Sequence, residues 1–218
     1  MVEAQHMVST SKIVDTMAEQ ALLEDILEES KPPIPKEATN LHFLLFSPFR
    51  YEPRQPNGSR FRAVHEPGVF YAAETVRTAA AEVSYWRWRF LHDTAGLERL
   101  QPCSFTAFKV PIKTSCIDLR EQPFAGESSK WLHPTDYSAT QALARIARQA
   151  DIGAIQYQSV RDPEKHYCVA VLTPLAFAAK KPDAATRTWM LAISTEEAIW
   201  MRQDGESFSF RTDRWEIT

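Results

Sequence analysis

One segment in the first half of the chain combines residue types that suit chemistry on a nucleotide. Residues 58–85 read GSRFRAVHEPGVFYAAETVRTAAAEVSY and place Arg60 and Arg62 before an apolar run that ends near Tyr71. A helix-like stretch follows, in which Glu82 is the carboxylate among alanines and other mostly small residues. Two guanidinium groups, an aromatic ring and a partly buried carboxylate could bind nucleotide phosphates and stabilise positive charge on a ribose.

Each of these groups would have a separate task in breaking a nicotinamide–ribose bond. Arginine forks bind pyrophosphate oxygens at two points, which lysine does less well. A tyrosine ring can stack on nicotinamide and hold it in a reactive pose. A carboxylate near the ribose stabilises the oxocarbenium-like transition state without having to act as a nucleophile.

Simpler interpretations of the same residues stay open. Glu82 could be a solvated helix residue, and Arg60 and Arg62 could share a solvent-facing side of a strand. Tyr71 could belong to the core. The six glycines form neither of the usual phosphate-binding loops, so the common dinucleotide and P-loop folds are not expected.

Composition describes an ordinary globular chain. Of 218 residues, 44% are hydrophobic and 24% are charged, and no apolar run approaches the roughly 20 residues that span a bilayer. We therefore expect a cytoplasmic protein without a membrane partner. The net charge of −3 gives no reason to expect nucleic acid.

The cysteines, histidines and tryptophans suggest structural roles. Three scattered cysteines predict buried free thiols, and the histidines show no ligand spacing, so no metal is expected. All six tryptophans are predicted to be packing residues.

The N-terminal part differs from the rest in charge. Residues 1–40 carry eight acidic and three basic residues, which leaves the remainder slightly basic. The first ten residues are expected to be disordered, and the segment KPPIPKE ends the helix that follows them. We predict an acidic helical extension with a proline-rich linker over residues 1–40 and one domain over residues 41–218. The helix could pack on that domain, contact a partner or stay loose.

Hydrophobic periodicity and turn residues predict the remaining elements. We expect strands at residues 41–46, 69–72, 104–110, 116–119, 154–160, 168–173, 189–194, 198–202 and 207–212, and helices at residues 11–29, 75–90 and 135–150. Thr75 should cap the second helix, with Ala79, Val83, Trp86 and Phe90 as its apolar stripe. Thr135 or Asp136 should cap the third helix, with Leu143, Ile146 and Ala147 facing inward.

Other signals complete the predicted fold. Three prolines and Asn57–Gly58 indicate a loop at residues 47–59, and Asp204–Gly205 indicates a hairpin turn. Strands outnumber helices and gather late in the chain without regular alternation. The predicted class is therefore α+β with a mainly antiparallel sheet.

The segments SRFR, GVFYAAE and TAAAEV, in this order, resemble the start of the RES domain, a family named for an Arg, a Glu and a Ser. Tyr71 and Glu82 match the family pattern in type and in their spacing of eleven positions. Arg60 is the better match for the family arginine, and Arg62 is the alternative. The resemblance covers about residues 41–210, so the N-terminal extension falls outside it.

A second segment carries the third named residue. The stretch IQYQSVRDPEKHYCVAVLTP resembles the family's sequence around its serine, which makes Ser159 the equivalent residue, with Arg161 close by. The resemblance implies that Arg60 or Arg62 binds phosphates or orients the ribose, Tyr71 stacks on nicotinamide and Glu82 stabilises the oxocarbenium. Ser159 would contact the nicotinamide amide or the ribose.

The resemblance also implies a fold, a co-substrate and a partner. RES proteins are toxins of bacterial toxin–antitoxin pairs with a fold like that of ADP-ribosyltransferases, and they act on NAD⁺. The segments LLFSPFRYEP and SVRDP are most similar to the ParT-type members, which transfer ADP-ribose to the enzyme that makes phosphoribosyl pyrophosphate. The partner implied is a Xre/ParS-type antitoxin whose C-terminal segment plugs the NAD⁺ pocket, usually within a larger symmetric assembly.

Three functions remain open at this point. The first is transfer of ADP-ribose to a protein, and the second is NAD⁺ phosphorolysis or hydrolysis with the same residues and a different acceptor. The third is a non-catalytic interaction domain.

Overall fold

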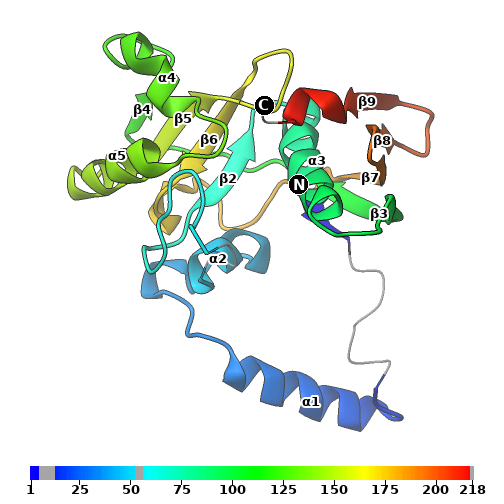
Figure 1. Cartoon of the computed structure of the whole chain (residues 1–218). Helices are drawn as coiled ribbons and strands as arrows, with labels where there is room; N and C mark the ends of the chain where they lie inside the picture. Colours follow the sequence, from blue (N-terminus) through cyan, green and yellow to red (C-terminus); the bar gives the residue numbers. More distant parts are fainter. Residues whose placement is uncertain (5–12, 53–55, 217–218) are drawn as a thin grey trace.

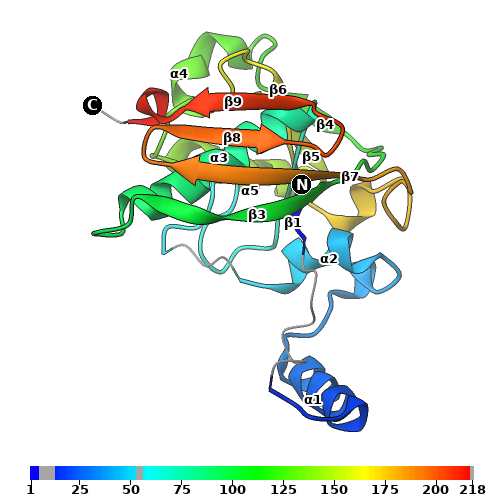
Figure 2. The ribbon, with the colours of Figure 1, turned by 90° about the vertical axis from the view of Figure 1, so that its right-hand side faces the viewer.

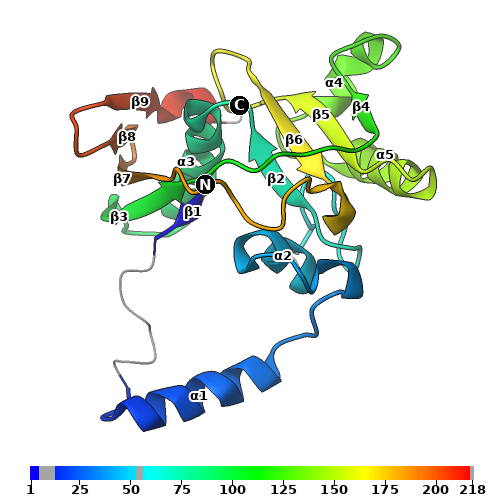
Figure 3. The same cartoon turned by 180° about the vertical axis from the view of Figure 1, so that it is seen from behind.

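Two β-sheets and the long helix α3 (Val76–His92), which contacts strands of both, form the body of the protein (Figure 1). The computed structural model describes residues 1–4, 13–52 and 56–216. One sheet has the strand order β1-β3-β7-β8-β9, seen face-on in Figure 2. The other has the order β2-β6-β5-β4 and is seen from behind in Figure 3.

The strands are β1 (Val2–Glu3), β2 (Phe70–Ala73), β3 (Arg99–Ala107), β4 (Cys116–Asp118), β5 (Ala154–Gln158), β6 (Tyr167–Val171), β7 (Arg187–Ser194), β8 (Glu197–Met201) and β9 (Ser207–Arg211). The other α-helices are α1 (Met17–Ser30), α2 (Phe43–Arg50), α4 (Ser128–Trp131) and α5 (Ser138–Gln149). Short 3₁₀ helices lie at Lys36–Ala38, Phe124–Glu127, Pro174–Ala176 and Thr212–Trp215.

The strand pairing confirms the predicted fold class. Neighbouring strands run antiparallel except β4 and β5, which are parallel. Eight of the predicted strands coincide with observed ones to within a few residues. The turn at Asp204–Gly205 joins β8 to β9 as predicted, and Gly205 adopts the positive φ of 92° that glycine accepts without strain.

The N-terminus is more ordered than the sequence predicts. Residues 2 and 3 form β1, which pairs with β3, and Glu3 makes an ion pair with Arg87 of α3. Burial lowers the pKa of the Met1 ammonium group below its usual value. The expectation of disorder is wrong for residues 1–4, and residues 5–10 lie outside the described part of the chain.

Helix α1 begins at a capping box and stands away from the body (Figures 1 and 3). The Thr16 hydroxyl accepts the Glu19 backbone N–H, and the Glu19 carboxylate accepts the Thr16 N–H, which satisfies two free donors. Among the described residues of α1, none is buried. Arg50 reaches it through a hydrogen bond of 2.7 Å to Glu28.

Residues 41–46, predicted as a strand, instead open helix α2. A short apolar run cannot be assigned to strand or helix from periodicity alone, and here the His42 side chain accepts the Leu44 N–H and caps a helix. The helix extends through Pro48 into the predicted loop and buries Leu45 beside Phe70. A Cβ on Gly68 would lie only 2.2 Å from the Pro48 carbonyl oxygen, so the chain approaches α2 too closely for a side chain there.

Helix α3 starts where the sequence predicts, because the Thr75 hydroxyl accepts the Thr78 N–H. However, the side of α3 that faces the core is opposite to the side that the sequence predicts. Tyr85 and Trp88 pack into a cluster with Trp189 and Trp200 of the five-stranded sheet. The predicted stripe of Ala79, Val83, Trp86 and Phe90 lies away from this cluster's centre, with Trp86 and Phe90 exposed.

Helix α5, the tryptophans and the cysteines differ in part from their predicted burial. The helix starts at Ser138, where Asp136 accepts the first N–H, but Ile146 is exposed while Ala144 and Ala147 are buried. The other tryptophans are buried, as predicted, and Trp86 is not. The cysteines are all free, but Cys116 is exposed and Cys103 only partly buried, whereas Cys168 is buried. None of the helices in the described part of the chain is long and apolar enough to cross a membrane.

A buried hydrogen bond fastens α3 to the five-stranded sheet and can be tested by mutation. The Trp200 indole N–H donates to the Ser84 hydroxyl at 2.8 Å, and both residues are fully buried. Ser84→Ala leaves this donor without a partner, so we expect the free energy of unfolding in urea to fall by about 1–3 kcal/mol. Ser30→Ala removes an exposed hydroxyl on α1 and should have little effect. Equal midpoints for the two variants would contradict this role of Ser84.

Candidate active site

A cleft of about 600 Å³ lies beside α3 and contains most of the residues singled out from the sequence. Its volume falls within the usual range for small-molecule and cofactor sites. Strand β2, the cleft-facing side of α3 and the chain after β3 supply much of the wall. The lining residues are Met1, Ser59, Arg60, Phe70, Tyr71, Ala72, Ala73, Glu74, Thr75, Val76, Ala79, Glu82, Val83, Trp86, Ala107, Phe108, Lys109, Val110, Tyr137, Tyr157, Arg161 and Cys168.

Glu82 projects into this cleft from the second turn of α3. It is partly buried, and its Oε1 accepts a hydrogen bond of 2.6 Å from the Ser159 hydroxyl. The Cys168 thiol lies 3.8 Å from the same oxygen, and burial followed by the nearby Glu82 charge raises the pKa of this thiol. The thiol therefore stays protonated beside the carboxyl group.

Ser159 is a buried residue that follows β5 and does not line the cleft. Its hydroxyl oxygen accepts the backbone N–H groups of Arg161 at 3.2 Å and Asp162 at 3.0 Å. With both acceptor positions used, the hydroxyl proton is directed at Glu82. In this geometry the Ser159 hydroxyl contacts the Glu82 carboxylate. The contact with nicotinamide or ribose that the family resemblance implies stays a prediction.

A second hydrogen bond joins the same two segments one turn earlier on α3. The Thr78 hydroxyl donates to the Asp162 carboxylate at 2.7 Å, and both side chains are buried. Asp162 also accepts the Glu164 N–H and lies 3.1 Å from His166. These contacts fix the loop that carries Ser159 against the start of α3.

The two candidate arginines occupy different places. Arg60 is buried, lines the cleft and stacks on Tyr137, with its guanidinium carbon 4.8 Å from the ring centroid. Arg62 bonds to the carbonyls of Glu66 and Tyr51 instead and is not part of the lining. Of the two, Arg60 alone is placed to meet a ligand in the cleft.

Arg161 supplies a second cation. It is buried, lines the cleft and lies over the Tyr85 ring, 3.4 Å from its centroid. Its guanidinium donates to the Pro134 carbonyl, while Arg60 donates to the carbonyls of Trp131 at 2.8 Å and His133 at 3.0 Å. Backbone oxygens of one short segment, residues 131–134, therefore hold both cations.

Tyr71 shows its ring to the cleft because side chains alternate along β2. Phe70 points into the core, and Tyr71 is 39% exposed on the other face. The Tyr71 hydroxyl accepts the Phe61 N–H at 2.9 Å and is 2.8 Å from the Ser59 hydroxyl. Burial of this hydroxyl raises its pKa, so the phenol stays neutral.

Several residues of the site carry no signal that sequence reasoning could use. Tyr137 and Tyr85 support the two arginines, and Tyr157 lies deep in the cleft wall with a pKa raised well above its usual value by burial. None of them belongs to a motif, and scattered tyrosines indicate no site. Packing is the role that the sequence predicts for Trp86, although its place on the same face as Glu82 could have suggested the cleft.

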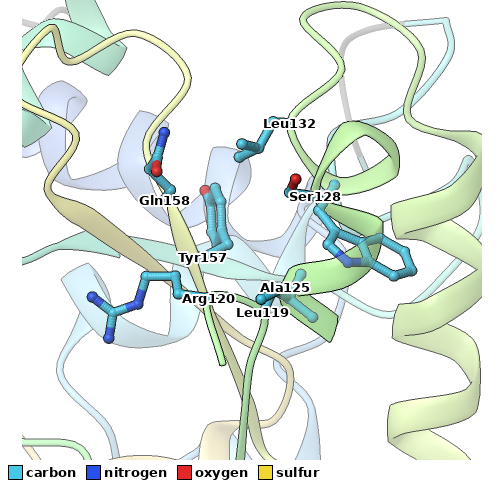
Figure 4. A pocket seen from close by; sticks show the side chains of 8 residues that line it. Leu119, Arg120, Ala125, Ser128, Leu132, Tyr157 and Gln158 are labelled. Carbon is cyan, nitrogen blue, oxygen red and sulfur yellow. The ribbon is translucent and has the colours of Figure 1, made fainter. Parts of the chain in front are cut away.

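A smaller cavity of about 130 Å³ shares Tyr157 with the cleft as a lining residue (Figure 4). Its lining includes Ser128, Trp131 and Leu132, so the segment that holds the arginines also forms its wall. Arg120, near its edge, is paired with Asp118 at 2.7 Å. This cavity is too small for a nucleotide.

The assembled cleft offers an oriented carboxylate, two cations held by neutral groups and open aromatic rings. Such a set can bind a phosphate-bearing ligand and stabilise positive charge beside the carboxylate. Among the described residues, no three histidine, cysteine or acidic side chains are grouped so that they could hold a metal ion.

Comparison with known proteins identifies the family. The model of the RES domain matches residues 34–194, which is well over half of the chain. A search of curated proteins finds no match. The matched region contains Arg60, Tyr71, Glu82 and Ser159, and the family is associated with NAD-related activity in toxin–antitoxin systems. The chain belongs to the RES-domain family.

Proposed function

We propose that this protein is a cytoplasmic toxin that breaks the nicotinamide–ribose bond of NAD⁺ and transfers ADP-ribose to a protein, as the ParT-type members do. The candidate acceptor is ribose-phosphate pyrophosphokinase, and the candidate partner is a Xre/ParS-type antitoxin that occupies the cleft. The observation that carries the proposal is the Glu82 carboxylate, held by Ser159 in a cleft with two cations.

The positions of the side chains suggest how binding would proceed. The guanidinium groups of Arg60 and Arg161 would bind the pyrophosphate oxygens, and the Tyr71 ring would stack on nicotinamide. This arrangement would place the nicotinamide ribose near Glu82. NAD⁺ serves as co-substrate, and no metal takes part in the proposal.

The bond would break with its electron pair leaving on the nicotinamide nitrogen, which neutralises the pyridinium. Positive charge then develops on the ribose, and the fixed Glu82 carboxylate stabilises it without a covalent bond. A nucleophile of the acceptor protein attacks the anomeric carbon, forms the new bond and gives its proton to solvent. Ser159 acts through Glu82 by keeping the carboxylate in place.

Phosphate is the second candidate acceptor, and one feature favours it. Lys109 adds a third, exposed cation to the cleft wall, where it could hold inorganic phosphate. In that case the products are nicotinamide and a phosphorylated ADP-ribose, and the cell's NAD⁺ pool is drained. Hydrolysis would use water at the same position.

Glu82→Gln is the first test of the proposal. The amide keeps the shape of the side chain but loses its charge, so we expect nicotinamide release from NAD⁺ to fall by at least about 100-fold. The assay is chromatographic quantification of nicotinamide, and Glu98→Gln, at an exposed position beyond α3, serves as the matched control. Undiminished release by Glu82→Gln would refute the assigned role, and loss of growth inhibition with the same variant would argue against a purely interacting domain.

The acceptor is identified with NAD⁺ labelled on its adenylate side, incubated with and without phosphate and with a cell lysate. Label on a discrete protein band supports ADP-ribose transfer. Small products alone support depletion instead, by phosphorolysis if they require phosphate and by hydrolysis if they do not. A wild-type protein that releases no nicotinamide under any condition contradicts the whole proposal.

Ser159→Ala tests the orienting hydrogen bond separately. A hydrogen bond to a charged group contributes about 1.5–3 kcal/mol, so we expect kcat to fall roughly 10- to 100-fold. KM for NAD⁺ should change little, because Ser159 does not line the cleft. Ser207→Ala, on exposed β9, is the control. An increase in KM at constant kcat would show that Ser159 contacts substrate instead.

A further inference from the structure

Six aromatic residues border the cleft, and the rings of most of them are in contact with other side chains. They are Phe70, Tyr71, Trp86, Phe108, Tyr137 and Tyr157. Phe70 and Phe108 contact each other at 6.4 Å between centroids, Tyr137 carries the Arg60 guanidinium, and Tyr157 packs edge-on against a buried phenylalanine. Tyr71 and Trp86 are the two aromatic residues of the lining that are left to meet a ligand.

These two side chains present open ring surfaces. Tyr71 is 39% exposed, and within the described part of the chain no aromatic ring or guanidinium group stacks on it. Trp86 is 41% exposed and meets Tyr85 at a steep angle of 72°, with the centroids 5.2 Å apart. This contact is not a stack, and Trp86 is among the residues that line the cleft.

The position of Trp86 relates it directly to the proposed reaction. It lies four residues after Glu82 on the same side of α3, about 6 Å farther along the helix axis. Its neighbour Arg87 is paired with Glu3 of β1, which keeps this turn of α3 close to the strand at the cleft's edge. Trp86 therefore lies on the cleft wall one helical turn away from the Glu82 carboxylate.

We infer that Trp86 stacks on the adenine ring of the dinucleotide. The inference rests on the proposed function, because it follows from a ligand with two planar bases joined by a pyrophosphate. The cleft offers one aromatic ring for each base, Tyr71 and Trp86, and two guanidinium groups for the pyrophosphate. With nicotinamide on Tyr71 beside the reacting ribose, Trp86 is the surface left for the second base. Stacking on an aromatic ring favours binding of either base type and needs no hydrogen-bond pattern.

The test measures binding of each half of the dinucleotide by calorimetry. We expect Trp86→Ala to weaken binding of AMP by roughly 5- to 100-fold, the range that base–aromatic stacking contributes. Binding of nicotinamide mononucleotide should be unchanged. Trp86→Phe keeps a ring and should retain most of the AMP affinity. Phe90→Ala removes an exposed ring one turn farther along α3, outside the cleft lining, and should alter neither ligand.

Three results would overturn the inference. These are wild-type protein that does not bind AMP, AMP affinity that survives Trp86→Ala, and an equal loss for both ligands. The last would place Trp86 at the reacting end. AMP binding needs no bond cleavage, so failure of this inference is distinguishable from failure of the proposed function, which nicotinamide release measures on its own. Near-ultraviolet circular dichroism checks that the variants keep the native packing.

Discussion

The hydrogen bond between Ser159 and Glu82 connects the two halves of the molecule at the point where chemistry would occur. Glu82 belongs to a helix whose other side is buried against the five-stranded sheet, whereas Ser159 follows β5 of the four-stranded sheet. Thr78 and Asp162 repeat the connection one turn earlier on the helix. The position of the carboxylate thus depends on both sheets.

The cations of the cleft are held without being neutralised. Within the described part of the chain, neither Arg60 nor Arg161 is paired with a carboxylate; carbonyl oxygens of residues 131–134 and tyrosine rings support them instead. Carbonyl dipoles and ring faces offset part of the desolvation cost of a buried guanidinium but leave its full charge. The arrangement costs folding free energy and keeps a positive potential that an anionic ligand can use. Arg62, by contrast, is occupied by local carbonyls outside the cleft.

The parts of the fold and the site that could be predicted from the sequence are those marked by a capping residue, a turn motif or a reactive side chain. Thr75 marks the start of α3, and Asp204–Gly205 marks a hairpin. The face that α3 buries is not predictable, because apolar residues occur on two of its sides and the choice depends on the sheet that it meets. Glu82 stands out in the sequence as a carboxylate among small residues, eleven positions after Tyr71. The carbonyls of residues 131–134 have no signature, since every residue has a carbonyl group. The hydrogen bonds of Ser159 are not predictable either, because its partners are backbone N–H groups and a helix residue far away in sequence.

Helix α1 is held by local contacts near its ends, whereas α3 is held by packing in the core, and α1 takes no part in the cleft. Its capping box and the Glu28–Lys31 pair are exposed, and the second pair joins exposed Glu28 to a largely buried Arg50 side chain. An ion pair with an exposed partner contributes little in water. An isolated helix of 14 residues is close to the length at which helices are marginal. None of the described residues of α1 lines the cleft, whereas Met1, next to β1, does. The cleft is therefore built by elements that share the core, and loosening α1 would leave its walls in place.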